Sequence, residues 1–349
     1  MKLFIQIPCF NEEATLPAVI SELPRVIDGV DEIYTIVIDD GSTDRTAEVA
    51  QEIGVDYILK NAGNCGLAQT FAKGIDVCLL LGADLIVNTD GDNQYFGADI
   101  PQLVAPLLEN RADIVIGCRD IANHEEFSGL KKFLHQVGSY VVNWLSNVSI
   151  PDVTSGFRAL NRRAAMHLIM MTMFSYTIEM LIQAGRRGLR LFWVPIQVNP
   201  AYRPSRLFRS NSHFIIMQLK TMLKVYLYYC PLRFFSWLVA FLGIVVLLSL
   251  ARLSYYLLFV GEDFAKFKIG TGLLLLFCLL LAVIFIVSGF LGQIMTGQRY
   301  VMEDIRYRIL NNQDTQKRLL AEYDLIAAPQ FFRWKRYQYS PQPRQTLGV

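Results

Sequence analysis

Cysteine is sparse in this sequence, and its spacing suggests neither a zinc site nor a disulfide framework. The six cysteines are scattered through 349 residues without a C-x-x-C pair, and Cys278 lies inside a long apolar segment. Zinc modules and small disulfide-bonded domains need closely paired cysteines. The pattern therefore argues against both and favours a reducing compartment.

A signal peptide and a strong charge excess are also lacking. The first residues, MKLFIQIPCFNEE, turn polar after one short apolar segment, which does not resemble a secretory signal. We therefore expect the region up to residue 211 to stay in the cytosol. The formal net charge of +2 identifies no partner by itself, and we expect no nucleic-acid partner.

Long apolar runs, in contrast, are present. No charged residue occurs from Phe234 to Ala251 or from Ile269 to Gln298. Each run is close to or above the roughly 20 residues that a helix needs to cross a hydrocarbon layer. The alternative, two buried helices of a soluble core, would normally interrupt such runs with a polar face. The sequence therefore predicts two transmembrane helices.

Basic residues flank the two runs on the side away from their short connecting loop. Six Arg or Lys and no Asp or Glu occur from Arg203 through Arg233, and Arg299, Arg306 and Arg308 follow the second run. Loops rich in Arg and Lys tend to stay in the cytosol. We therefore expect a multi-pass membrane protein with both termini on the cytosolic face.

Before the apolar runs, short β-rich segments alternate with helix-like ones. The predicted strands are LFIQIP, IYTIVID, DYILK, DLIVNTD and ADIVIGC, and each is followed by a polar motif: PCFNEE, DDGSTD, NAGNCG, TDGDNQ and CRD. Such alternation predicts a parallel sheet covered by helices, in which ligands bind at the carboxyl ends of the strands.

The polar motifs favour a metal-bridged nucleotide over a dinucleotide. A dinucleotide-binding domain would carry G-x-G-x-x-G after the first strand, but this chain has Asn11, Glu12 and Glu13 there. Acidic loops can hold a nucleotide diphosphate when a divalent cation bridges them. Asp90 and Asp92 offer the hard oxygen ligands that Mg²⁺ and Mn²⁺ prefer, although a D-x-D motif alone is weak because it also arises by chance.

Five motifs together carry a resemblance to a known family. IPCFNEE, VIDDGSTDRT, NTDGDNQ, IGCRD and DVTSGFRALNRRA occur in the order seen in family 2 glycosyltransferases with the GT-A fold. The chain looks most like the polyprenyl-phosphate branch, which includes dolichol-phosphate mannosyltransferase and bacterial undecaprenyl-phosphate glycosyltransferases. The resemblance covers roughly residues 1–210. It implies an α/β GT-A domain, which is followed here by the two predicted transmembrane helices.

The resemblance also implies roles for individual residues. It leaves open whether Asp39 or Asp40 accepts a hydrogen bond from the nucleobase, and Glu12 could instead be a first-turn acid of a helix. The implied residues are, for the nucleotide, Pro8, Phe10, Glu12, Asp39, Asp40 and Gly91; for Mg²⁺ or Mn²⁺, Asp90, Asp92 and Gln94; and for the reaction centre, Asp152 and Arg119.

A polyprenyl phosphate acceptor would need positive charge more than a strong base. Its phosphate monoester has a second pKa of about 6 and is mostly a dianion at neutral pH. The candidates for binding it are Arg119, Lys131, Lys132 and Arg206, any of which could instead contact anionic lipid. Asp152 could orient the acceptor, act as a base or only pair with Arg158. Glu179 is either a catalytic acid or an ordinary helix carboxylate.

Two segments depart from the family pattern. The loop expected to close the site reads RPSRLFRS, so the roles of Arg203, Arg206 and Arg209 cannot be transferred from relatives. The segment QFFRW, residues 330–334, resembles a motif of processive synthases but follows the apolar runs instead of preceding them. We interpret it as coincidence or as an interfacial anchor.

The predicted layout has four parts. The segment FIIMQLKTMLKVYLYY places apolar residues on one helical face and Lys220 with Lys224 on another, as expected for a helix lying in the headgroup plane. The alternative is a buried amphipathic helix. The parts are a cytosolic catalytic domain over 1–211, an interfacial helix over 212–232, two transmembrane helices with a short external loop over 233–291, and a cytosolic tail over 292–349.

The sequence predicts a metal-dependent, inverting transfer of a sugar from a UDP- or GDP-sugar to polyprenyl phosphate at the membrane. The alternatives are a family 2 enzyme with a polysaccharide or glycolipid acceptor, a non-catalytic nucleotide-sugar-binding partner and, less favoured, a nucleotidyltransferase. The sugar, the nucleotide and the formation of a homo-oligomer stay open.

Overall fold

The computed structural model describes residues 1–121, 129–170, 176–200, 220, 223–224, 226–259, 264–310, 312, 315 and 319–327. The chain forms two compact units. One comprises residues 1–221 and 303–349 and the other residues 222–302. We call them the sheet unit and the helix-pair unit, and each is described by itself.

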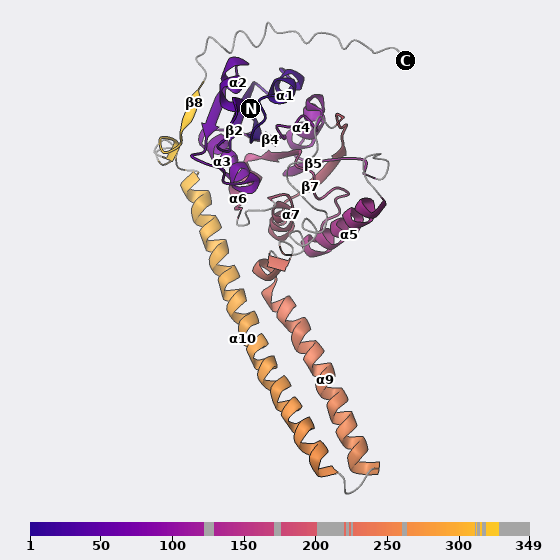
Figure 1. Ribbon diagram of the computed structural model, residues 1–349. Helices are drawn as coiled ribbons and strands as arrows, with labels where there is room; N and C mark the ends of the chain where they lie inside the picture. Colours follow the sequence, from indigo (N-terminus) through magenta and orange to yellow (C-terminus); the bar gives the residue numbers. More distant parts are fainter. Residues whose placement is uncertain are drawn as a thin grey trace. The chain divides into compact units, whose positions relative to one another are not determined.

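An eight-stranded sheet forms the centre of the sheet unit, with the strand order β7-β5-β6-β4-β1-β2-β3-β8 (Figure 1). The predicted parallel α/β sheet is confirmed for the five N-terminal strands. Three strands were not predicted: β6, which runs antiparallel to β4 and β5, β7, which runs parallel to β5, and β8, which runs antiparallel to β3. The strands are β1 (Lys2–Cys9), β2 (Glu32–Asp39), β3 (Tyr57–Lys60), β4 (Leu85–Asn88), β5 (Ile114–Cys118), β6 (Arg158–Asn161), β7 (Leu191–Pro195) and β8 (Leu325–Ala327).

Helices cover both faces of the sheet, and the side chains of β1 point alternately to one face and to the other. Leu3, Ile5 and Ile7 point into a core shared with α1, α2 and α4, whereas Gln6 faces Gly74 of α3. On the α3 side, Phe71 stacks on Tyr176 with ring centroids 4.0 Å apart. The helices are α1 (Leu16–Glu22), α2 (Thr46–Glu52), α3 (Leu67–Leu80), η1 (Gly97–Asp99), α4 (Ile100–Leu108), α5 (Gly129–Ser146), α6 (Arg162–His167) and α7 (Tyr176–Arg187).

The direction of β6 decides which loop reaches the polar edge of the sheet. Arg158, the first residue of β6, pairs in register with Asn88 at the end of β4 and with Ile116 of β5. The segment before β6, residues 152–157, therefore meets the carboxyl ends of the parallel strands. The motif DVTSGFR joins the other polar motifs for this reason.

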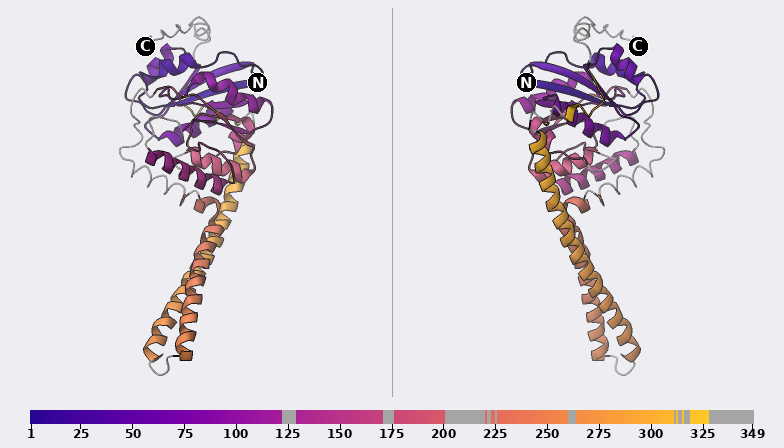
Figure 2. Two further views of the ribbon diagram at one scale, coloured as in Figure 1. Left: turned by 90° about the vertical axis from the view of Figure 1, so that its right-hand side faces the viewer. Right: turned by 90° about the vertical axis from the view of Figure 1, so that its left-hand side faces the viewer.

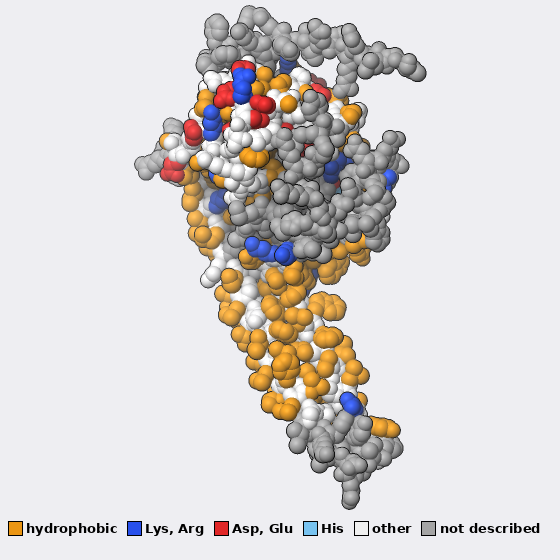
Figure 3. Space-filling model, viewed as in Figure 1, with side chains coloured by type: hydrophobic (Ala, Val, Ile, Leu, Met, Phe, Trp, Pro, Cys, Tyr) orange, Lys and Arg blue, Asp and Glu red, His pale blue; other side chains and the backbone are white. Residues whose placement is uncertain are grey.

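The helix-pair unit consists of α9 (Pro231–Phe259) and most of α10 (Phe264–Leu310), which run side by side in both views of Figure 2. Two segments are long and apolar enough to cross a membrane, Pro231–Tyr255 and Gly270–Gln298. Only 6% and 11% of their most apolar windows are buried, unlike core helices of a soluble protein. Hydrophobic side chains cover most of the described part of the pair on the face that Figure 3 shows.

Small residues lie where the two helices are close. A Cβ at Gly292 of α10 would lie 2.6 Å from the Cβ of Pro231, and a Cβ at Gly289 would lie 3.2 Å from that of Phe235. Thr296 Oγ1 donates to the carbonyl of Tyr228 at 3.0 Å. Close contact through small residues is a common way for helices to associate in lipid.

The chain returns to the sheet unit after the apolar segments. α10 continues to Leu310, beyond residue 291, where the predicted transmembrane part of the chain ends. Residues 303–310 already belong to the sheet unit, and β8 then pairs with β3 at the edge of the sheet (Figure 1).

Candidate active site

Hydrogen bonds between residues far apart in the sequence join the loop after β1 to the loop after β2. Asn11, which has a left-handed backbone with φ of 56°, accepts from Thr43 N through its side chain at 2.8 Å. Its own backbone N–H donates to Ser42 Oγ at 2.9 Å. The motifs PCFNEE and DDGSTD therefore form one surface at the carboxyl ends of two neighbouring strands.

Glu12 and Gly91 bring a third loop to this surface. Thr15 Oγ1 lies 2.9 Å from Glu12 Oε2 and 2.7 Å from the carbonyl oxygen of Gly91. A Cβ at Gly91 would come within 2.8 Å of Cys9 Sγ and 3.3 Å of the Pro8 carbonyl oxygen. Only glycine fits between β1 and the two aspartates. Phe10, which lies on the loop after β1, is 39% exposed.

Asp39 and Asp40 differ in how far they are already engaged. Asp40 accepts from Cys65 N at 2.8 Å, Asn61 Nδ2 at 2.8 Å and Gly66 N at 2.9 Å, so both of its oxygens hold the loop after β3. Asp39 Oδ1 accepts from Ser42 N at 3.0 Å. Of the two carboxylates that the sequence left open, Asp39 is therefore the less engaged within the protein.

Asp90 and Asp92 follow β4 and carry unusual electrostatics. Asp90 Oδ1 is buried and has no hydrogen-bond partner within the described residues. Burial, the charge of Asp92 and that of Glu12 raise the pKa of Asp90 to about 7, although Arg119 and Arg158 counteract them. Asp92 Oδ1 accepts from the backbone N–H of Gln94 at 3.1 Å. A buried carboxylate without a donor, beside a second carboxylate, is unfavourable unless a proton or a cation neutralises it.

The donor set of this loop fits a divalent cation bound jointly with a ligand. Among the described residues no group of three or more His, Cys, Asp or Glu side chains could hold a metal ion, so the protein offers Asp90 and Asp92 as its carboxylates. Mg²⁺ and Mn²⁺ are commonly held by one or two carboxylates together with phosphate and water. The orphaned oxygen of Asp90 is the observation that favours a cation here.

Asp152 lies at the centre of a network that includes Arg119. Its Oδ2 accepts from Arg119 Nε at 2.7 Å, and its Oδ1 lies 3.3 Å from Arg119 Nη2, 3.1 Å from His135 Nε2 and 2.8 Å from Thr154 Oγ1. Burial alone would raise the pKa of Asp152, but the hydrogen bonds from His135 and Arg119 and the positive charge of Arg119 hold it well below its usual range. Asp152 is therefore an ionised carboxylate that accepts hydrogen bonds, which leaves it a poor general base.

Arg158 does not pair with Asp152, one of the alternatives that the sequence left open. Its buried guanidinium donates to the carbonyls of Ser155 at 2.8 Å, Thr177 at 2.8 Å and Val153 at 2.9 Å. Arg158 thus joins α7 to the loop that carries Asp152. Glu179, also on α7 and buried, lies 3.3 Å from Gln183 Nε2.

Several predicted positions lie outside the described residues. They include the side chain of Lys131, the loop with Arg203, Arg206 and Arg209, most of the segment 212–225, and QFFRW. Lys132 is described and lies half-buried on α5. The acceptor-binding roles of these residues stay predictions.

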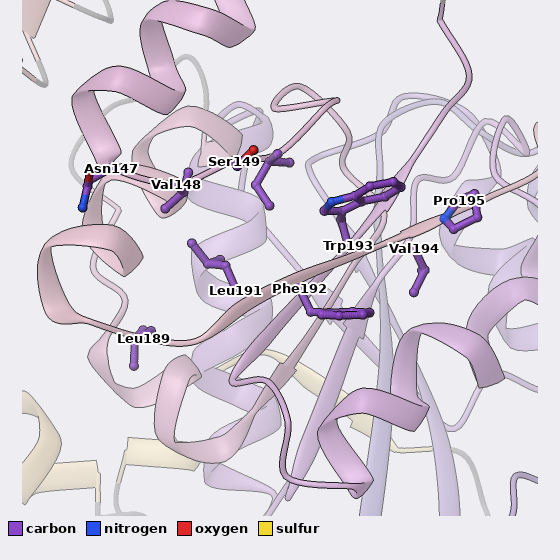
Figure 4. A pocket seen from close by; sticks show the side chains of 10 residues that line it. Asn147, Val148, Ser149, Leu189, Leu191, Phe192, Trp193, Val194 and Pro195 are labelled. Carbon is purple, nitrogen blue, oxygen red and sulfur yellow. The ribbon is translucent and has the colours of Figure 1, made fainter.

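A hollow elsewhere in the sheet unit contains none of the predicted site residues. It has a volume of about 740 Å³ and lies between residues 147–150 and β7, with Trp193 and Pro195 at one end in the close-up (Figure 4). Its lining is mostly apolar. The polar chemistry is at the strand ends instead.

Sequence reasoning missed His135 and Tyr95. Tyr95 OH accepts from Gly156 N at 2.8 Å, and its ring lies 5.9 Å from the Arg119 guanidinium carbon, so it supports both sides of the site. Its position directly after Gln94 was a usable signal. His135 is one of only four histidines in the chain and follows Lys131 and Lys132 by a few residues, but its partners come from a loop seventeen residues or more away.

The acidic loops and the exposed Phe10 ring lie at the carboxyl ends of parallel strands, which is where open α/β sheets bind their ligands. Residues 4–169 match the family described as Glycosyl transferase family 2. Over 116 residues the chain is 34% identical to protein RfbJ of Shigella flexneri, an alignment that covers 32% of this chain and 81% of that protein. The chain belongs to glycosyl transferase family 2.

Two further similarities place the chain within this class. It is 27% identical over 217 residues to the UDP-N-acetylglucosamine–dolichyl-phosphate N-acetylglucosaminyltransferase of Methanococcus voltae, covering 56% of this chain and 84% of the relative. Its fold is similar to that of glucosyl-3-phosphoglycerate synthase from Mycobacterium tuberculosis, with a TM-score of 0.50 and 23% identity over 63% of this chain and 79% of that chain. The predicted family, the GT-A fold and the glycosyltransferase activity are thereby confirmed.

Proposed function

We propose that this protein transfers a sugar from a nucleoside diphosphate sugar to the phosphate of a polyprenyl phosphate at a membrane, with inversion at the anomeric carbon. The observation that carries the proposal is the placement of two charge systems at one edge of the sheet. Asp90 and Asp92 suit a cation with a diphosphate, and Arg119, held by Asp152, suits the acceptor phosphate.

The donor half of the site would be formed by the loops after β1, β2 and β4. Phe10 offers an exposed ring to the nucleobase, and Asp39 is the carboxylate available to accept from a base N–H. Asp90 and Asp92 would hold Mg²⁺ or Mn²⁺ against the diphosphate. The cation would neutralise charge that develops on the leaving nucleotide.

The acceptor half needs no strong base, which agrees with the ionised state of Asp152. A phosphate monoester is already mostly a dianion at neutral pH. The work left to the protein is to hold this dianion and offset its charge, for which Arg119, with Lys132 of α5, provides positive charge. Asp152 fixes the orientation of Arg119 by occupying its Nε–Nη2 edge.

A lipid acceptor is also supported by the helix-pair unit. A chain with two helices of membrane-spanning length and composition would keep its catalytic site near the surface where a lipid phosphate lies. The Arg and Lys residues that flank these helices favour a cytosolic catalytic site. The acceptor named for the Methanococcus voltae relative is consistent with this chemistry.

Labelled-sugar transfer in membranes tests the proposal. Washed membranes containing the protein are incubated with Mn²⁺ or Mg²⁺, polyprenyl phosphate and radiolabelled UDP- and GDP-sugars, and an Asp92→Asn variant of nearly equal size serves as the matched control. Label should enter an acid-labile lipid with the native protein only, and the donor that supplies it names the sugar.

Two results would contradict the proposal. Donor binding or hydrolysis without labelled lipid would favour another acceptor or a non-catalytic role. Equal labelling by the Asp92→Asn variant would show that the reaction does not need a cation bound by Asp92.

A further inference from the structure

His135 is directed into the protein from a helix whose opposite face is open. Its side chain is 12% exposed, whereas Tyr140 and Trp144 on the other face of α5 are 73% and 63% exposed. Because the imidazole lies against Asp152 and Thr154, its neighbours are functional groups of the candidate site.

The direction of each hydrogen bond in this network follows from the ionised state of Asp152. An ionised carboxylate only accepts, so the proton between His135 and Asp152 lies on Nε2 of His135. Thr154 Oγ1 donates to the same carboxylate at 2.8 Å. The remaining lone pairs of Thr154 can then accept from Arg119 and His135.

His135 Nε2 contacts the same two acceptor atoms as Arg119 Nη2. The distances to Asp152 Oδ1 are 3.1 Å from His135 and 3.3 Å from Arg119, and those to Thr154 Oγ1 are 3.3 Å and 3.0 Å respectively. Asp152 Oδ1 also accepts from Thr154 N at 3.1 Å. One carboxylate oxygen thus faces more donors than its two lone pairs can satisfy.

Because His135 Nε2 contacts the same atoms, Arg119 Nη2 can move away from Asp152 Oδ1 without leaving this buried carboxylate oxygen unpaired. A phosphate dianion prefers two parallel N–H groups of one guanidinium, and the Nε–Nη2 edge of Arg119 is taken by Asp152. The two N–H groups of Nη2 are already shared between Asp152 Oδ1 and Thr154 Oγ1, so a phosphate at the other edge would compete with these acceptors for one of them. The cost of that competition depends on what replaces Nη2.

We propose that His135 is a positioning residue, which replaces Arg119 Nη2 at Asp152 and Thr154 when Arg119 binds the acceptor phosphate. This inference rests on the proposed polyprenyl phosphate acceptor. Without His135, Asp152 retains Nη2 more strongly, and the acceptor binds less well. Donor binding is unaffected because the donor loops are held by other contacts.

Three variants of the full-length protein in membranes separate this role from a structural one. His135→Phe keeps a ring but has no donor, His135→Gln keeps an amide N–H at a similar reach, and Gln136→Ala changes the adjacent exposed residue. The KM values for polyprenyl phosphate and for the nucleotide sugar are measured for each variant.

The Phe variant should raise the KM for polyprenyl phosphate about tenfold, the size expected for a lost hydrogen bond to a charged group. Its KM for the donor should stay within about twofold of the native value, and the Gln variant should recover most of the acceptor affinity. A loss of folded protein would lower kcat and leave both KM values unchanged.

The outcomes are distinct. If the native protein labels lipid but Phe and Gln variants behave alike, the role of His135 is wrong and the proposed function stands. If donor and acceptor KM values rise together, His135 supports the whole site and this inference is also wrong. A native protein that labels no lipid overturns the proposed function and this inference with it.

Discussion

Arg306, near the end of α10, forms an ion pair with Asp76 of α3. The same guanidinium donates to the carbonyls of Met166, at 3.1 Å, and of Leu168. The next residue, Tyr307, stacks on His167 with ring centroids 5.2 Å apart. The segment that follows the apolar helices is therefore fastened to the sheet unit before it adds β8 to the sheet.

Replacing Arg306 should destabilise the sheet unit. Arg306→Ala removes the partner of a carboxylate and of two carbonyls at a site where only 22% of the side chain is exposed. We expect the free energy of unfolding to fall by about 1 to 3 kcal/mol, seen as a lower melting temperature of the purified protein.

Arg45 provides a matched control for this loss. It pairs with Glu52, but the two side chains are 65% and 62% exposed, and such surface pairs contribute at most about 1 kcal/mol. Arg45→Ala should therefore melt close to the native protein. If Arg306→Ala melts there too, the contact does not hold the C-terminal segment.

The raised pKa of Asp90, about 7, should make cation binding depend on pH. A cation must displace the proton that burial and Asp92 keep on this carboxylate, so Mn²⁺ affinity should fall as pH drops from about 8 to about 6. Titration of Mn²⁺ followed by electron paramagnetic resonance measures this. An affinity that stays constant over this interval would show that Asp90 is not a ligand.

Stability of the metal-free protein should show the opposite trend. Unfolded Asp loses its proton near pH 3.9, whereas folded Asp90 keeps it to about pH 7. The folded state binds more protons between these values, so Asp90 should lower the free energy of unfolding as pH rises from about 4 to about 7. Urea denaturation in a chelator should show a smaller decline for Asp90→Asn than for the native protein.

The parallel part of the fold was predictable because its signals are local. Each of the first five strands is a short apolar run that ends in a polar motif, and strands pointing the same way bring those motifs to one edge. Asp90 and Asp92 join the loops after β1 and β2 for this reason, whereas Asp152 reaches this edge because β6 runs antiparallel. The apolar helices were predictable from the length of two runs without charged residues.

Contacts that depend on distant partners were not predictable. β8 has three residues, and only its pairing with β3 defines it as a strand. The sequence offered Arg158 as a partner of Asp152, yet Arg119 takes that place because β6 runs antiparallel and directs Arg158 into the core. The role of His135 was not predictable from the sequence around it, because its partners Asp152 and Thr154 lie in a later loop and only the packing of α5 against that loop brings them together.

Gly41, in the loop after β2, tests the donor site. Its φ is +69°, and a Cβ there would lie 2.7 Å from the backbone of Gly63. Gly41→Ala should therefore displace the loop that Asp40 holds and weaken binding of UDP or GDP, measured by calorimetry.

Gly82→Ala is the control that distinguishes the steric clash expected at Gly41 from the strain of a positive φ alone. Gly82 has a φ of +87° but nothing within 4 Å of its Cβ position, so the variant should lose about 1 to 2 kcal/mol of stability and keep its nucleotide affinity. If both variants bind nucleotide like the native protein, the loop after β3 does not shape the donor site.

Gly292 should set how closely α9 and α10 pack. Because its Cβ would lie 2.6 Å from that of Pro231, Gly292→Ile must push the two helices apart, and helices in lipid have little hydrophobic driving force to compensate. Gly243→Ile adds the same side chain to an exposed position of α9 with nothing within 4 Å. In detergent, the Gly292 variant should melt several degrees lower than the Gly243 variant, because a packing defect costs about 1 to 3 kcal/mol. Equal melting temperatures would mean that this contact does not stabilise the pair.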